Sequence, residues 1–129
     1  MKKTYRQKAT KRLDGLLREI VRIRDENRCQ WCGKSVKGSN SQPSHVIPKA
    51  RCLHLRWDLL NVKLLCMSCH QKWHLNPVAG AEWFKSAYPA RYEYVLAMQH
   101  KTTHWKKADY ERIEANLKEK LADLKQRRT

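Results

Sequence analysis

Four of the five cysteines form two Cys-x2-Cys pairs, a spacing typical of metal ligands. Cys29 pairs with Cys32, and Cys66 pairs with Cys69. Thiols at this spacing converge on one ion, and four thiolates make a closed tetrahedral zinc site. A redox role for one pair is the weaker alternative, because no flanking βαβ pattern accompanies it. We therefore predict structural Zn²⁺ at these four cysteines and expect the remaining Cys52 to be a small buried side chain.

Two histidines follow the second cysteine pair directly, in "CMSCHQKWH". His70 and His74 are four residues apart on a segment expected to be helical, so their imidazoles lie on one face and can share one cation. The alternative is that His74 faces solvent and His70 packs beside the zinc. Because the cysteine knuckle fixes the start of the helix, the sequence favours the shared cation.

Two short strands are predicted ahead of this helix. They are "SHVIPK", which contains His45, and "NVKLLC", which begins at Asn61 and runs into the second cysteine pair. The helix itself is expected from Met67 to Asn76. A hairpin packed on this helix brings His45, Asn61 and the two helical histidines within reach of one phosphate.

The flanking segments are predicted to be basic and largely helical. Residues 1–9 are polar and basic and are expected to be flexible, and an amphipathic helix is expected over 10–28. After the core, helices are expected over 77–88 and 91–100. The last helix carries an apolar stripe, formed by Tyr110, Ile113, Leu117, Leu121 and Leu124. This stripe favours packing against the body of the protein over a homodimer formed through this helix.

The charge of the chain points to nucleic acid as the partner. Its 129 residues suffice for a single domain, and 28 Lys and Arg against 12 Asp and Glu give a formal net charge of +16. The basic residues expected to contact DNA are Lys49, Arg51, Arg56 and Lys72. We expect no small-molecule organic cofactor. With neither a membrane-length apolar run nor a signal peptide, the sequence predicts a soluble intracellular protein without membrane contact.

The central motifs resemble those of HNH endonucleases. "SHVIPK", "WDLLN" and "LLCMSCHQKWH" present histidine, asparagine, histidine and both cysteine pairs in the order and spacing of that family. The resemblance covers residues 29–77 and implies a ββα-metal (His-Me finger) core stapled by four-cysteine zinc. The expected fold class is α+β, mostly helical, with flanking N- and C-terminal helices. The segments "LLREIVRIRDENRCQWCG" and "LRWDLLNVKLLC" resemble phage recombination endonucleases of the NinG type, which implies a cytoplasmic protein of the host cell.

The resemblance also implies a role for each residue of the site. His45 would be the general base that takes a proton from the water attacking the scissile phosphorus. Asn61 would hold the hairpin loop and orient His45, while His70 and His74 would hold one divalent cation, namely Mg²⁺, Mn²⁺, Ni²⁺ or Zn²⁺. The family usually has a metal-ligating aspartate or histidine where this chain has Ser44, which is therefore a candidate ligand of the same cation although a hydroxyl is a poor one.

The missing third ligand leaves alternatives open. Asp58 and His54 lie nearby in the sequence and are candidates to replace it.

We predict a metal-dependent DNA endonuclease that hydrolyses phosphodiester bonds, with recombination intermediates, branched or nicked DNA as the expected substrates. In this reading the core over 29–77 and a helical basic extension over 78–129 belong to one domain. The alternatives are a zinc-stapled nucleic-acid-binding protein without catalysis and a scaffold that uses its last helix.

Overall fold

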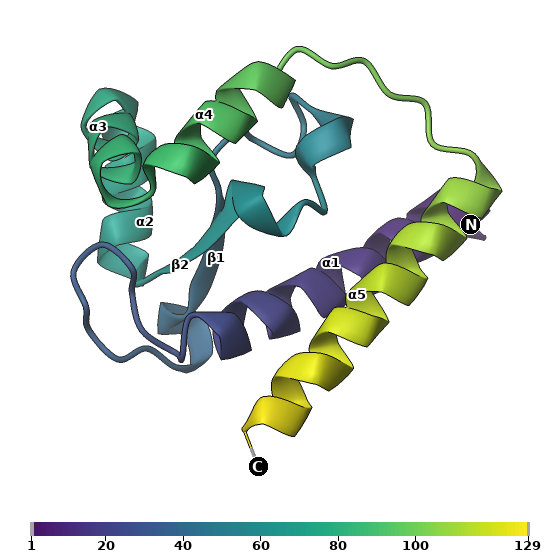
Figure 1. Cartoon of the computed structure of the whole chain (residues 1–129), viewed down its shortest axis with the longest axis horizontal. Coiled ribbons are helices and arrows are strands. Elements are labelled where there is room, and N and C mark those ends of the chain that lie inside the picture. The colour runs from purple at the N-terminus through teal and green to yellow at the C-terminus, as the bar shows by residue number, and fades with distance from the viewer. Residues whose placement is uncertain (1, 129) are drawn as a thin grey trace.

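Five α-helices surround a two-stranded antiparallel sheet in the computed structural model, which describes residues 2–128 (Figure 1). In chain order the helices and strands are α1 (Tyr5–Arg24), β1 (Gln42–His45), β2 (Val62–Leu65), α2 (Met67–Leu75), α3 (Pro77–Ala87), α4 (Pro89–Met98) and α5 (Lys107–Arg127). The predicted mostly helical fold is confirmed at this level. Among the described residues, no helix has both the length and the apolar character needed to cross a bilayer.

The two longest helices, α1 and α5, lie side by side and run in the same direction (Figure 1). Arg12 pairs with Glu114 at 3.2 Å and Glu19 pairs with Lys125 at 3.1 Å, so positions on the two helices advance together. The buried members of the α5 stripe are Tyr110, Leu117 and Leu121, and they join the main core with residues of α1. The stripe therefore packs against the body of the protein, which is the arrangement that the sequence favours.

The N-terminal residues are helical from Tyr5 onwards, which corrects the expected flexible segment over 1–9. Thr4 and Gln7 form a capping box: Thr4 Oγ1 accepts from the Gln7 N–H at 3.2 Å, and Gln7 Oε1 accepts from the Thr4 N–H at 2.9 Å. These bonds satisfy amide groups that a helix start leaves unpaired, so the helix begins earlier than expected. Of this segment, Met1 lies outside the described residues.

The far end of α1 also differs from the prediction. The helix ends at Arg24 and not near residue 28, because Glu26 and Asn27 adopt positive φ angles of 55° and 53°. Such left-handed residues cannot continue a right-handed helix. The turn that they form carries the chain directly into the first cysteine pair.

The hairpin ends earlier than the "SHVIPK" segment suggests. Strand β1 pairs with β2 so that Ser44 lies opposite Lys63, and it stops at His45. The cause is the side chain of Asn61, whose Oδ1 accepts from the Ile47 N–H at 2.9 Å and whose Nδ2 donates to the Ile47 carbonyl at 3.0 Å. With both polar groups of Ile47 taken, the pairing ends after one further backbone bond, from the Val46 N–H to the Asn61 carbonyl.

Helix α2 follows the hairpin and contacts both of its strands, α3 packs on α2, and α4 packs on α3 and on the turns before β2 (Figure 1). Helix α3 begins at Pro77, where the missing N–H has no cost, and the side chain of Asn76 accepts from the exposed amide of Ala79. Helix α3 comes very close to α2 at Gly80, since a Cβ at this position would lie 2.5 Å from Cε3 of Trp73. Glycine at position 80 is thus what allows the Trp73 ring to be buried between the helices.

Candidate functional site

The four paired cysteines come together, as predicted, in a cluster that fits one metal ion. Their sulfur atoms all lie within 4.8 Å of one another, and Cys32 Sγ is 3.9 Å from Cys66 Sγ. Tetrahedral zinc with Zn–S bonds of about 2.3 Å separates its sulfur ligands by roughly 3.8 Å. Within residues 2–128 this is the only group of three or more Cys, His, Asp or Glu ligand atoms so placed. Cys52 is buried elsewhere, with its Sγ 3.7 Å from the Met98 carbonyl.

Local backbone geometry shapes the cluster. Gly33 follows the first pair with a φ of +81°, a left-handed turn that glycine adopts without strain. The N–H of Cys32 donates to Cys29 Sγ at 3.4 Å, and the second pair repeats this bond at 3.3 Å. Burial acts to raise the pKa of Cys29, but backbone hydrogen bonds outweigh it and bring this pKa to about 7. Cys29 is thereby shifted towards the thiolate form that binds metals.

The second cysteine pair also sets the register of the two histidines on α2. Cys66 caps this helix through its Sγ, and His70 and His74 then follow on one face. Their Nε2 atoms lie 3.2 Å apart, with the ring planes at 90°. Two imidazoles bound to one ion, with bonds of about 2.1 Å and an angle of about 100° between them, have their nitrogens at this separation. The pair is therefore arranged to share one cation or one proton.

The surroundings of His70 favour its neutral, metal-binding form. Burial lowers the pKa of His70 below 6.5, and the neighbouring His74 and Lys63 lower it further. The Nδ1 atom is buried and has no hydrogen-bond partner among the described residues. A neutral ring binds a cation through the lone pair of its unprotonated nitrogen.

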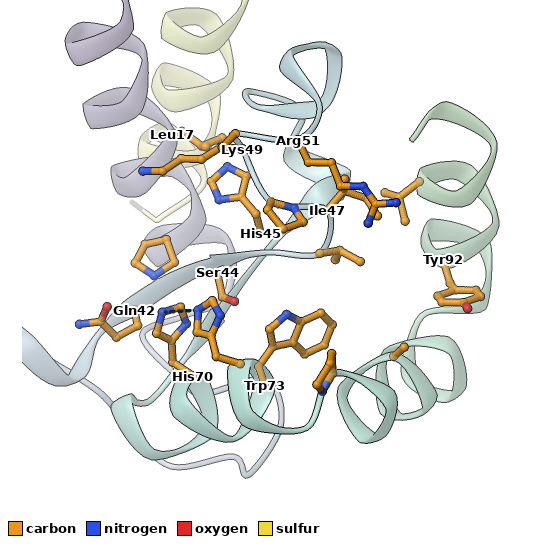
Figure 2. A pocket seen from close by; sticks show the side chains of 18 of the residues that line it. Leu17, Gln42, Ser44, His45, Ile47, Lys49, Arg51, His70, Trp73 and Tyr92 are labelled. Carbon is orange, nitrogen blue, oxygen red and sulfur yellow. Dashed lines mark hydrogen bonds between the residues drawn. The ribbon is translucent and has the colours of Figure 1, made fainter. Parts of the chain in front are cut away.

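Residues from the hairpin and from α2 line one cavity of about 690 Å³. Its lining includes Ser44, His45, His70, His74 and Trp73. In Figure 2, Ser44 points towards His70 and Trp73, whereas the His45 ring lies on the other side of the strand, near Lys49. Neighbouring strand residues point to opposite faces, which accounts for this division. Ser44 thus lies between the histidine pair and His45.

The imidazole of His45 is fixed by one backbone carbonyl. Its Nε2 lies 2.8 Å from the Arg56 carbonyl oxygen, which can only accept, so Nε2 carries the proton. In the neutral ring the lone pair therefore belongs to Nδ1. Burial lowers the pKa of His45 below 6.5; the bond to Arg56 raises it, while Lys49 and Lys63 lower it. At neutral pH the ring is consequently uncharged and able to accept a proton.

Asn61 holds the loop that supplies this carbonyl. It is fully buried, and besides its two bonds to Ile47 its Nδ2 donates to the Leu55 carbonyl at 3.1 Å. Its own carbonyl accepts from the Val46 N–H at 2.7 Å. These bonds close the loop between the strands and so place the segment that orients His45.

Lys63 is a member of the site that the sequence analysis missed. Its side chain is fully buried, and its Nζ donates to Ser44 Oγ at 3.0 Å and to the His45 carbonyl at 3.3 Å. Burial holds the pKa of Lys63 well below 10.5, with Arg91 lowering it further. The signal in the sequence is a lysine inside the otherwise apolar strand "VKLL". An amino group on Ser44 argues against the predicted role of this serine as a metal ligand.

The predicted DNA contacts fall into two groups. Lys49 and Arg51 are exposed at the cavity, and Lys72 is exposed on α2 with its Nζ 4.4 Å from the centre of the Trp31 ring. Arg56 differs, because its guanidinium forms two bonds to the Asp14 carboxylate, at 3.2 and 2.8 Å. Its charge is neutralised within the protein, which argues against the predicted DNA contact.

Neither substitute for the missing ligand reaches the histidine pair. Asp58 caps a 3-10 turn through the Leu60 N–H and accepts a hydrogen bond from Tyr94. His54 has its Nδ1 3.2 Å from the Thr103 hydroxyl, and neither residue lines the cavity. These contacts speak against either residue as the missing ligand, since Asp58 is bonded to Tyr94 of α4 and His54 to Thr103 in the segment after α4.

Comparison with known proteins identifies a family. A search of the curated proteins and a search of the solved structures each found no match. The family model described as "Bacteriophage Lambda NinG protein" matches residues 1–127, which is nearly the whole chain and includes the cysteine cluster, the hairpin and both long helices. The chain therefore belongs to the bacteriophage lambda NinG protein family.

Proposed function

We propose that this protein is a metal-dependent DNA endonuclease of the HNH class that acts in phage recombination inside the host cell. The observation that carries the proposal is the pair of His70 and His74 nitrogens, 3.2 Å apart at the wall of the cavity that His45 also lines. The family match and the resemblance of the central motifs support the same function. The net charge of +16 supports DNA as the partner.

In this proposal each residue acts through a stated atom. His70 and His74 would hold a divalent cation through Nε2, and such a cation would supply positive charge beside the phosphate oxygens. His45 takes a proton from the attacking water through Nδ1, because Nε2 is bound to the Arg56 carbonyl. Asn61 keeps the loop in place and is a positioning residue. The cysteine cluster would hold structural zinc and would take no part in proton transfer.

A nicking assay on supercoiled plasmid tests this function. Zinc-loaded parent, His45→Ala and His70→Ala are compared with Mg²⁺, Mn²⁺ or Ni²⁺ added separately, and His100→Ala, an exposed histidine outside the cavity, is the matched control. We expect nicking by the parent and the control, a loss of about 100-fold or more in His45→Ala, and a raised cation requirement in His70→Ala. A parent that nicks with none of these cations would exclude the nuclease.

One observation favours a second candidate, a nucleic-acid-binding protein without catalysis. The amino group of Lys63 lies on Ser44, where the resembling family usually has a metal ligand, and its charge disfavours a cation nearby. This candidate predicts DNA binding by a protein that does not nick and that His45→Ala leaves unchanged. The scaffold alternative has lost its main support, because the apolar stripe of α5 is covered by α1.

A further inference from the structure

The buried amino group of Lys63 has three partners, and all of them are acceptors. Its Nζ contacts Ser44 Oγ at 3.0 Å, the His45 carbonyl at 3.3 Å and the face of Trp73 at 3.3 Å from the ring centre. An ammonium has three N–H donors and no acceptor, so this environment fits the charged form. Within residues 2–128 no carboxylate lies in ion-pair contact with Lys63. These contacts favour the charged form against the burial that lowers the pKa of Lys63, and they do so without a negative partner among the described residues.

Ser44 connects this charge to the cavity. Its oxygen accepts from Lys63, and no group among the described residues accepts a hydrogen bond from the Ser44 hydroxyl. The residue is only 2% exposed, yet it lines the cavity, and Figure 2 shows its oxygen directed to the side where His70 lies. The hydroxyl hydrogen is therefore available to a ligand in the cavity, while the oxygen is polarised by the ammonium behind it.

We propose that Ser44 and Lys63 form a binding site for a nonbridging oxygen of a DNA phosphate. Ser44 donates its hydroxyl hydrogen to this oxygen, and Lys63 supplies the compensating charge from the interior, where screening by water is weak. The site lies on the side of the strand that faces the histidine pair, in the cavity that His45 also lines. Where the resembling family uses a metal ligand, this chain thus holds the phosphate directly. The identification of the anion as DNA rests on the proposed function.

The test measures the affinity for a short duplex oligonucleotide with no divalent cation added, so that neither cleavage nor the histidine-bound cation contributes. Zinc-loaded parent, Ser44→Ala, Lys63→Met and the double variant are compared, with Ser41→Ala as the matched control. Ser41 is also a buried serine whose hydroxyl accepts from a cation, Arg22, but it does not line the cavity.

We expect roughly tenfold weaker binding for each single variant, because a charge-assisted hydrogen bond is lost. The double variant should be no weaker than either single variant, because both changes disrupt the same contact. Ser41→Ala should bind like the parent. Ser44→Asp should weaken binding at least as much as Ser44→Ala, since it places a carboxylate against the phosphate.

The proposal is overturned if Ser44→Ala binds as tightly as the parent, or if Ser44→Asp binds more tightly. Methionine at position 63 matches the length of lysine, and zinc content together with a thermal melt shows whether that variant folds. If it does not, the two substitutions at Ser44 decide the question. Because the assay detects binding and not cleavage, a negative result here is distinct from a parent that fails to nick plasmid.

Discussion

At the scale of single residues, the environment of His45 sets the pH range of the proposed reaction. A general base works in its neutral form, and burial lowers the pKa of His45 below 6.5. Cleavage should therefore persist into mildly acidic solution and fall only as pH drops through this lowered value. Single-turnover nicking rates between about pH 5 and pH 8, at saturating cation, measure the acid limb. A limb centred above 6.5 would contradict the assignment of His45 as the base.

Lys63 should lower the stability of the fold even though it supplies charge to the proposed phosphate site. Because its folded pKa lies below the ordinary 10.5, the unfolded state binds its proton more tightly, so this term disfavours folding at neutral pH. The penalty diminishes as pH rises through the folded pKa towards 10.5. We expect Lys63→Met to be more stable than the parent by on the order of 1–3 kcal/mol at neutral pH, with a smaller gain in alkaline solution.

Urea unfolding of the zinc-loaded proteins at about pH 7 and about pH 9 measures this difference. A variant less stable than the parent at both pH values would show that the contacts of Lys63 outweigh its desolvation. Together with the expected loss of DNA affinity, a gain in stability would mark Lys63 as a residue kept for binding and not for folding.

The sequence was informative about residues whose chemistry depends on spacing, and silent about those that depend on burial. The cysteine pairs and the two helical histidines are set by local spacing, and the structure brings each set together. The apolar residues around Lys63 mark it as unusual, but its contacts could not be predicted, because lysine is ordinarily a surface residue and its partners come from β1 and α2. The ion pair of Arg56 could not be predicted for the related reason that Asp14, its partner, lies in α1, far away in the sequence.

At the scale of elements, the metal cluster is expected to determine whether the hairpin and α2 fold. The cluster joins the turn after α1 to the start of α2, and Cys66 is both a predicted ligand and the cap of that helix. Structural zinc contributes on the order of 10 kcal/mol to the folding of small domains, which is comparable to the total stability of a domain. Removal of zinc by a strong chelator should therefore unfold the core.

Far-ultraviolet circular dichroism and tryptophan fluorescence, recorded during chelation, measure this loss. Cys32→Ser should reproduce it, whereas Cys52→Ala, which changes a cysteine outside the cluster, should retain one zinc per chain. A melting temperature that chelation leaves unchanged would argue against a structural metal at this cluster.

The pairing of α1 with α5 gives a second prediction at this scale. Leu117 is 5% exposed between the two helices, so Leu117→Ala leaves a cavity and should cost about 2–5 kcal/mol of stability. Leu96→Ala, at a leucine that is 40% exposed on α4, is the matched control and should cost less. Equal losses in urea unfolding would show that the two long helices do not depend on each other.

Element boundaries were predictable where their signals are local. The box formed by Thr4 and Gln7 is readable as "TYRQ", so the start of α1 could have been predicted. The end of β1 could not, because it is set by the Asn61 side chain from the other side of the loop. Sequence patterns thus predict the start of a helix more reliably than the end of a strand, when that end is set by hydrogen bonds from a distant part of the chain.

At the scale of the whole molecule, the parallel arrangement of α1 and α5 follows from the connection between them. The hairpin and the three shorter helices lie between α1 and α5 in the chain. The segment after α4 then returns to the start of α1, where α5 begins (Figure 1). Apolar stripes reveal which faces pack, but not whether two helices run in the same or opposite directions. The ion pair of Arg12 with Glu114 and the contact of the Tyr5 and Tyr110 rings fix the direction.

The net charge of +16 predicts that DNA affinity falls steeply as the salt concentration rises. The structure indicates which arginine side chains should contribute to this dependence. Each phosphate neutralised adds about 0.9 to the slope of log affinity against log salt concentration. Arg51 is exposed at the cavity, so Arg51→Gln should weaken binding and lower the slope by about one. Arg56→Gln should leave the slope unchanged, because this guanidinium is already paired with Asp14.

Fluorescence anisotropy over a salt series, at temperatures where both variants are folded, measures the two slopes. A lower slope for Arg56→Gln than for Arg51→Gln would place the DNA on the α1 side of the loop and not at the cavity.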